Sequence, residues 1–182
     1  MTNWKKILIG GILLASAFVY FKNDNAINNY NLGLKHMNGE GVAQDKFKAA
    51  DFFEKSCKSG IANACNNLGV IYETKSGVLK RGQDEDYIKA FGYFEKACVG
   101  GDALGCKNIA ALYLDGRGTT QDTIKAVKYY QKACDGKVAW GCHMLGYIYE
   151  NDKNLVVAKE YYRKACELDS ELLFSCQKYN EL

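Results

Sequence analysis

The sequence predicts an all-α fold, an α-solenoid of helix-turn-helix repeats with one disulfide per repeat. Three observations lead to this expectation: the chain of 182 residues contains no proline, a helical segment recurs four times, and eight cysteines recur with it. Proline breaks helix interiors, so its absence suits a chain that is helical almost throughout. Self-similarity at a period of about 36 residues is typical of stacked repeat units.

The first helix of each unit is a segment that begins with Asp or Asn and ends at a cysteine. Asp and Asn are favourable N-cap residues, and apolar residues follow them at helical spacing. The four segments are residues 45–57, 86–98, 122–134 and 154–166. Each contains an aromatic pair that we expect to lie mostly in the core, with one ring of each pair as a candidate for peptide contact: Phe52/Phe53, Tyr93/Phe94, Tyr129/Tyr130 and Tyr161/Tyr162.

The second helix of each unit has a recurring small residue. Its core segments are residues 65–72, 106–113 and 142–149, and the small residue is Gly69, Ala110 or Gly146. A glycine inside a helix costs about 1 kcal/mol relative to alanine, so its recurrence indicates that another helix approaches closely there. Asn31-Leu32-Gly33 fits the same frame and predicts an initial half unit without cysteines.

These segments set the expected domain boundaries. We expect one repeat domain over residues 26–182, with a half unit at 26–38 and complete units at 45–73, 86–115, 122–150 and 154–182. The connection at residues 75–85 carries a five-residue insertion, whereas the one at residues 151–153 is four residues shorter than its counterpart. Length variation is expected in the connections, because loops tolerate it better than packed helices do.

The combined motif carries a family resemblance. Gly-x-Gly-x-x-x-Asp at residues 39–45 and 116–122, Lys-Ala-x-x-Tyr-Tyr-x-Lys-Ala, and Leu-Gly-x-x-Tyr together resemble Sel-one-like repeats, which are relatives of the tetratricopeptide repeat (TPR). With its cysteine pairs, the chain looks like the Helicobacter cysteine-rich protein (Hcp) family over about residues 26–182. That resemblance also implies a β-lactam-binding or β-lactamase-type activity.

The eight cysteines are predicted to form structural disulfides. In three of the four pairs, eight residues separate a cysteine that ends the first helix from one that starts the second, and a helical hairpin brings these ends together. The last pair is separated by ten residues, and we expect it to close as well. No Cys-x-x-Cys and only two histidines occur, so we expect no metal and no cofactor. The predicted pairs are Cys57–Cys65, Cys98–Cys106, Cys134–Cys142 and Cys166–Cys176.

The N-terminus reads as an export signal. Lys5 and Lys6 precede an apolar run that ends in Ala15-Ser-Ala17, which predicts a signal peptide over residues 1–17, with an uncleaved anchor over residues 1–21 as the alternative. We therefore expect a periplasmic or secreted protein that meets the membrane only through an uncleaved signal. The net charge of +3 falls to +1 once residues 1–17 are removed, and a near-neutral chain argues against nucleic acid as a partner.

The motifs of serine β-lactamases are not reproduced here in a usable form. Ser175-Cys-Gln-Lys178 matches Ser-x-x-Lys and Lys75-Ser-Gly77 approaches Lys-Thr-Gly, but the two occur in reverse order and Ser-Asp-Asn is absent. His36 occupies the slot of Tyr72, Tyr113 and Tyr149, so we expect it to pack. His143 follows Cys142 at a helix start and is expected at the surface. A Ser-His-Asp triad stays open, without a supporting motif.

Three functions follow from these observations. The first is an exported, disulfide-stapled scaffold that binds a protein or peptide partner on a concave face built mainly from first-helix residues, as other helical repeats do. The second, implied by the Hcp resemblance alone, is binding or hydrolysis of a β-lactam or a similar cell-wall molecule. The third is a secreted effector that acts on a host or neighbouring cell.

Overall fold

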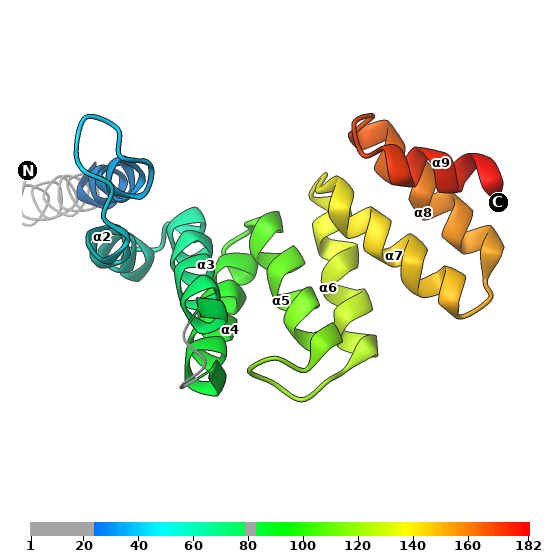
Figure 1. The fold of residues 1–182 in the computed structure, drawn as a ribbon, viewed down its shortest axis with the longest axis horizontal. Helices are drawn as coiled ribbons and strands as arrows, with labels where there is room; N and C mark the ends of the chain where they lie inside the picture. The colour runs from blue at the N-terminus through cyan, green and yellow to red at the C-terminus, as the bar shows by residue number, and fades with distance from the viewer. Residues whose placement is uncertain (1–23, 79–82) are drawn as a thin grey trace, which may run out of the picture.

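The computed structural model describes residues 24–78 and 83–182. Within these residues the chain forms nine helices and no strand, which confirms the all-α solenoid. A helix over residues 24–38 comes first, and each later helix packs beside the one before it from one end of the molecule to the other (Figure 1). The later helices are α2 (Lys46–Lys58), α3 (Ala62–Val78), α4 (Gln83–Val99), α5 (Ala103–Asp115), α6 (Thr123–Asp135), α7 (Ala139–Asn151), α8 (Leu155–Leu168) and α9 (Leu173–Glu181).

The predicted helix starts hold in three of the four units. The Asp45 carboxylate accepts the backbone N–H groups of Phe47 and Lys48, Asp122 accepts that of Lys125, and Asn154 caps α8 in the same way. The fourth prediction was wrong: α4 begins at Gln83, three residues before Asp86. The predicted signal segment lies outside the described residues, as do the side chains of Lys75–Gly77.

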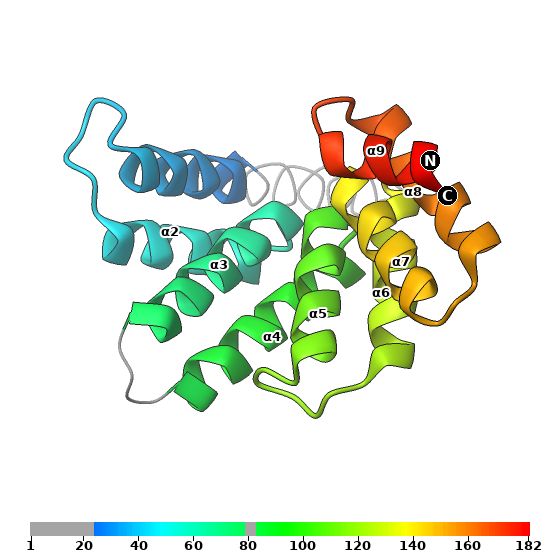
Figure 2. The same cartoon turned by 45° about the vertical axis from the view of Figure 1, so that its right-hand side comes forward.

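The described residues of the longer connection, 75–78 and 83–85, are helical. We expected a longer connection over residues 75–85, but α3 and α4 each extend to 17 residues, whereas α5 and α6 have 13. The extra residues therefore add helical turns to two neighbouring helices. Figure 2 shows α3 and α4 running side by side over their length.

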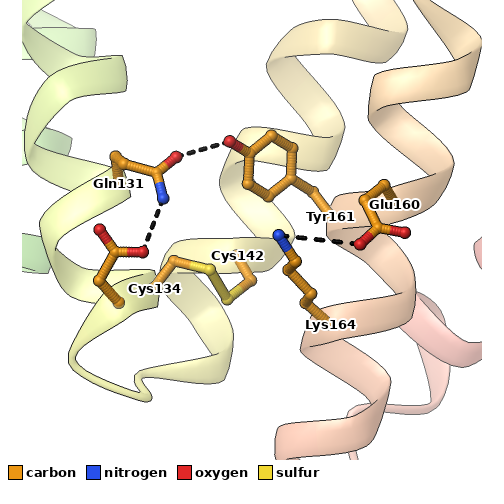
Figure 3. The surroundings of a disulfide bond; sticks show 7 residues. Gln131, Cys134, Cys142, Glu160, Tyr161 and Lys164 are labelled. Carbon is orange, nitrogen blue, oxygen red and sulfur yellow. Dashed lines mark hydrogen bonds and ion pairs between the residues drawn. A yellow bond between two sulfur atoms is a disulfide. The ribbon is translucent and has the colours of Figure 1, made fainter.

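Disulfides join the two helices of every unit. The bonds Cys57–Cys65, Cys98–Cys106, Cys134–Cys142 and Cys166–Cys176 link α2 to α3, α4 to α5, α6 to α7 and α8 to α9. Their Cα atoms lie 4.5 to 4.9 Å apart, inside the usual range for a disulfide. Figure 3 shows the third bond, at the turn between α6 and α7.

Stacked rings join each unit to the next. Four ring pairs lie nearly parallel, with centroids 5.5 to 5.6 Å apart: His36/Phe52, Tyr72/Tyr93, Tyr113/Tyr129 and Tyr149/Tyr161. Such pairs add about 0.5–1.5 kcal/mol beyond the burial of their area. Disulfides and ring stacks therefore alternate along the solenoid. The predicted packing role of His36 is confirmed, because its ring occupies the place of a tyrosine in the later units.

The recurring glycines lie against buried aromatic rings. A Cβ atom built on Gly33, Gly69 or Gly146 would lie 2.6 to 2.8 Å from a ring carbon. The rings belong to Phe53, Phe94 and Tyr162, all of them fully buried. The predicted close helix approach is confirmed, and the second residue of each aromatic pair is core.

Candidate binding surface

Charge is distributed unevenly between the two kinds of helix. In α7 the only charged residue is Glu150, and in α5 the only ones are Lys107 and Asp115. The adjacent α8 carries five charged residues: Lys159, Glu160, Arg163, Lys164 and Glu167. The cores of protein interfaces are depleted in charge and enriched in aromatic residues. The second helices therefore provide the more suitable surface for a partner.

A set of exposed apolar side chains lies on these second helices. Leu104 of α5 is 48% exposed, Trp140 and Tyr147 of α7 are 46% exposed, and Phe174 of α9 is 53% exposed. Leu104, Trp140 and Phe174 each stand two residues before the second-helix cysteine of their unit. We call these four residues the second-helix face. The sequence contains a signal for three of them, namely a large apolar residue at one fixed position relative to a cysteine.

The first helices carry a different apolar set. Phe47, Ile88, Ile124 and Val156 occupy equivalent positions in the repeat and are 57–85% exposed. Each unit contributes one of these side chains, whereas Trp140 and Phe174 both contact the ring of His143. Binding hot spots favour clustered Trp and Tyr over scattered aliphatic residues. This arrangement favours the second helices over the first helices, where we expected most binding residues.

His143 lies inside the aromatic cluster, so its expected place at the surface was wrong. It is 6% exposed, and its ring centroid lies 4.8 Å from that of Trp140 and 5.5 Å from that of Phe174. The cause is α9, which packs against α7 and covers the start of that helix. A contact across 32 residues of sequence cannot be seen in the local pattern around Cys142.

Two polar contacts fix α9 against α7. The Ser175 hydroxyl and His143 Nδ1 lie 2.8 Å apart, and Lys178 Nζ donates to Glu150 at 2.7 Å. Ser175 is fully buried and His143 Nδ1 is its one side-chain partner among the described residues, so we assign the hydroxyl as donor. Hydrogen bonds from Lys178 and Tyr162 lower the pKa of the Glu150 carboxyl. The Cys166–Cys176 disulfide joins α9 to α8, its other neighbouring helix.

The Ser-x-x-Lys sequence does not form a catalytic pair. Ser175 is buried beneath His143, while Lys178 turns to Glu150, so the two side chains have different partners. A substrate carbonyl has no approach to a fully buried hydroxyl in this arrangement. The Ser175–His143 pair also differs from a hydrolase triad, because the carboxylate of Glu150 bonds to Tyr162 and Lys178 instead of His143.

Other chemistry receives little support within residues 24–78 and 83–182. In this part of the chain, no three His, Cys, Asp or Glu side chains come together as a metal site. All eight cysteines are paired. Among the described helices, none combines the length and the apolar character that a membrane crossing requires. Structural disulfides on this scale suggest an oxidising environment outside the cytoplasm.

Comparison with known proteins identifies the repeat. Sel1 repeats match residues 29–61, 62–102 and 103–138, and a tetratricopeptide repeat matches residues 141–172. The chain belongs to the Sel1 repeat family. These Sel1 repeats begin with the helix that we counted second in each unit. In the frame of these matches, the first three disulfides therefore each join the end of one repeat to the start of the next, whereas Cys176 lies beyond the last matched repeat.

Individual relatives support the Hcp resemblance. The chain is 37% identical over 76 residues to a Helicobacter pylori protein named "Putative beta-lactamase HcpE", which covers 40% of this chain and 19% of that protein. It is 28% identical to Helicobacter pylori cysteine rich protein B (HcpB), with a TM-score of 0.55, covering 72% of this chain and 94% of that one. The chain thus spans less than a fifth of the curated relative that it matches.

A third relative is similar over most of the Sel1 solenoid. The structure of c5321, a protective antigen present in uropathogenic Escherichia coli strains, displays an SLR fold and superimposes with a TM-score of 0.72 at 32% sequence identity. The match covers 78% of this chain and 30% of that one. The match supports the fold and the repeat, and it names no binding partner.

Burial of His143 makes the stability of the Sel1 solenoid depend on pH. Burial lowers the pKa of His143 below 6.5, and the nearby Glu150 offsets this in part. The unfolded chain then binds more protons than the folded chain as the pH falls. We expect the free energy of unfolding, measured in urea, to decrease as the pH falls below about 6.5, the ordinary pKa of histidine. His143→Gln should remove this part of the decrease; an unchanged pH profile in that variant would contradict the assignment.

Proposed function

We propose that the protein is an exported, disulfide-stapled Sel1 scaffold that binds a protein or peptide partner through its second-helix face. The observation that supports this most directly is the set of half-exposed Leu104, Trp140, Tyr147 and Phe174 on helices with few charges. A folded chain does not gain stability by keeping such side chains in water, whereas a partner that covers them gains about 25 cal/mol for each Å² of apolar surface removed from water.

The proposal also includes the cellular location of the protein. Eight cysteines in four disulfides suit the periplasm or the exterior of the cell, and the predicted export signal agrees with either. Both the periplasmic role and the role of a secreted effector use the same face. β-Lactam hydrolysis receives no comparable support, because Ser175 is buried and bonded to His143.

A pull-down from envelope extract under oxidising conditions tests the proposal. The bait variant combines Trp140→Ala with Phe174→Ala, which removes two aromatic side chains from the second-helix face. The matched control combines Ile124→Ala with Val156→Ala, two side chains that are 85% and 84% exposed on the first helices. We expect a specific partner to be recovered by the wild type and the control, and its recovery by the bait variant to fall at least about tenfold, as for hot-spot residues.

Three outcomes of the pull-down would contradict the proposal. The first is the absence of any specific partner. The second is equal recovery by the two double variants, and the third is a loss confined to the first-helix variant. Thermal unfolding of all three proteins shows whether a loss of binding reflects a loss of folding; both double variants should remain folded at the temperature of the pull-down.

A further inference from the structure

Polar side chains accompany the apolar ones along the second helices. The residues that directly follow the second-helix cysteines are Asn66, Lys107, His143 and Gln177. Three positions before each of them stands Asn63, Leu104, Trp140 or Phe174, and residues three apart lie on the same side of a helix. A polar row and a mainly apolar row therefore run next to each other from unit to unit.

Lys107 is the one cationic member of the polar row. Its side chain is half-buried, and among the described residues no carboxylate lies within 4 Å of its ammonium group. The nearest acidic influence is Glu73, whose carboxylate is already paired with Arg117 at 3.3 Å. Burial accordingly lowers the pKa of Lys107, with Glu73 offsetting only part of the effect. A half-buried ammonium group of this kind is stabilised by an added carboxylate.

The two units that follow the unit of Lys107 provide the aromatic part of the face. The rings of Trp140 and Phe174 both contact His143, and Tyr162 contacts the same ring from below at 5.6 Å. The bond from Ser175 to Nδ1 holds the His143 ring in place. The exposed halves of Trp140 and Phe174 thus belong to a fixed aromatic surface that needs no rearrangement before binding.

We infer that the partner is an extended protein segment that places an acidic side chain on Lys107 and a large apolar side chain against Trp140 and Phe174. The inference rests on the proposed function and specifies the chemistry of the segment bound there. Lys107, Trp140 and Phe174 come from three successive units, and an extended chain advances about 3.3–3.6 Å per residue, so one segment can reach all three. His143 acts as a positioning residue for the two rings.

Synthetic peptides test this inference. The probes are ten-residue peptides of Gly and Ser that carry one Phe and one Asp at every separation in both orders. Matched probes have Asn in place of Asp or Ala in place of Phe. With the oxidised wild type, we expect at least one separation at which the Phe and Asp peptide binds about tenfold more tightly than its Asn counterpart, as a charge-assisted hydrogen bond allows.

Two variants test the acidic contact and the apolar contact separately. Lys107→Gln keeps the length and polarity of the side chain, and should abolish the preference for Asp over Asn while the dependence on Phe remains. Trp140→Ala should abolish the dependence on Phe. A wild type that binds Asp and Asn peptides equally, a Lys107→Gln variant that keeps the preference, or no binding of any peptide would overturn the inference.

The pull-down separates this inference from the proposed function. If the partner is lost from the Trp140→Ala/Phe174→Ala bait but the peptides show no preference for Asp, the face binds a partner of different chemistry and only the inference fails. If that bait retains the partner, the proposed function itself fails. A partner that proves to be a nucleic acid or a membrane lipid would overturn both.

Discussion

Reduction of the four disulfides is expected to lower the free energy of unfolding by about 10 kcal/mol. In the loop-entropy model, closing a loop of eight residues stabilises the folded chain by about 2.5 kcal/mol and a loop of ten by slightly more. The total is comparable with the whole stability of an ordinary domain, which is about 5–15 kcal/mol. Urea unfolding with and without dithiothreitol measures the difference directly, and we expect the reduced chain to be largely unfolded without denaturant.

A single unit provides the matched control for this result. Replacing both Cys98 and Cys106 by Ser removes one disulfide and leaves the other three, so the expected loss is about 2.5 kcal/mol in oxidising buffer. The double variant should then lose less on reduction than the wild type does. Oxidised and reduced forms of equal stability would contradict the stapling role and would assign the stability to the packed helices alone.

Alanine at Gly69 is expected to destabilise the solenoid by about 1–3 kcal/mol. A Cβ atom there would lie 2.6 Å from a ring carbon of Phe94, which is fully buried and has no space to move away. The next unit carries Ala110 at this position, and its methyl group packs in the buried cluster that contains Tyr130. Thermal or urea unfolding of oxidised protein measures the loss.

Gly92 offers the opposite case within the same pair of helices. It lies in the interior of α4, and a Cβ atom built on it meets nothing within 4 Å. Alanine restricts the unfolded chain and suits a helix, so Gly92→Ala should stabilise the protein by about 0.5–1 kcal/mol. Effects of the same sign at Gly69 and Gly92 would show that helix propensity, and not the approach of Phe94, decides the result.

Local repetition made most of the fold predictable. Cysteines eight residues apart at a helical turn, Asp at the helix starts and a small residue opposite an aromatic pair all depend on residues close in sequence, or on the same place in the next unit. The start of α4 was missed for a related reason. Asp86 has the position of an N-cap in the repeat, but the inserted residues before it form helix, so Asp86 lies inside α4 and is buried.

Local sequence patterns predicted less of the candidate binding surface than of the fold. The burial of His143 arises from the packing of α9 on α7, a contact between different units. The hydrogen bonds of Ser175 with His143 and of Lys178 with Glu150 have the same origin. The preference for the second helices over the first likewise requires the exposure of each side chain in the folded structure, because Trp140 and Ile124 look equally apolar in the sequence. The low charge of α7 was visible in the sequence and is the signal that could have directed attention there.

Photo-crosslinking is the most direct test of the central claim, which is that the second helices bind the partner. The amino acid p-benzoylphenylalanine is placed at Leu104 or Tyr147 on the second-helix face, and at Ile124 on the first helices as the control. Irradiation in envelope extract should link the partner to the first two positions and leave the third unlinked. Crosslinks that form at Ile124 and are absent at Leu104 and Tyr147 would contradict the account.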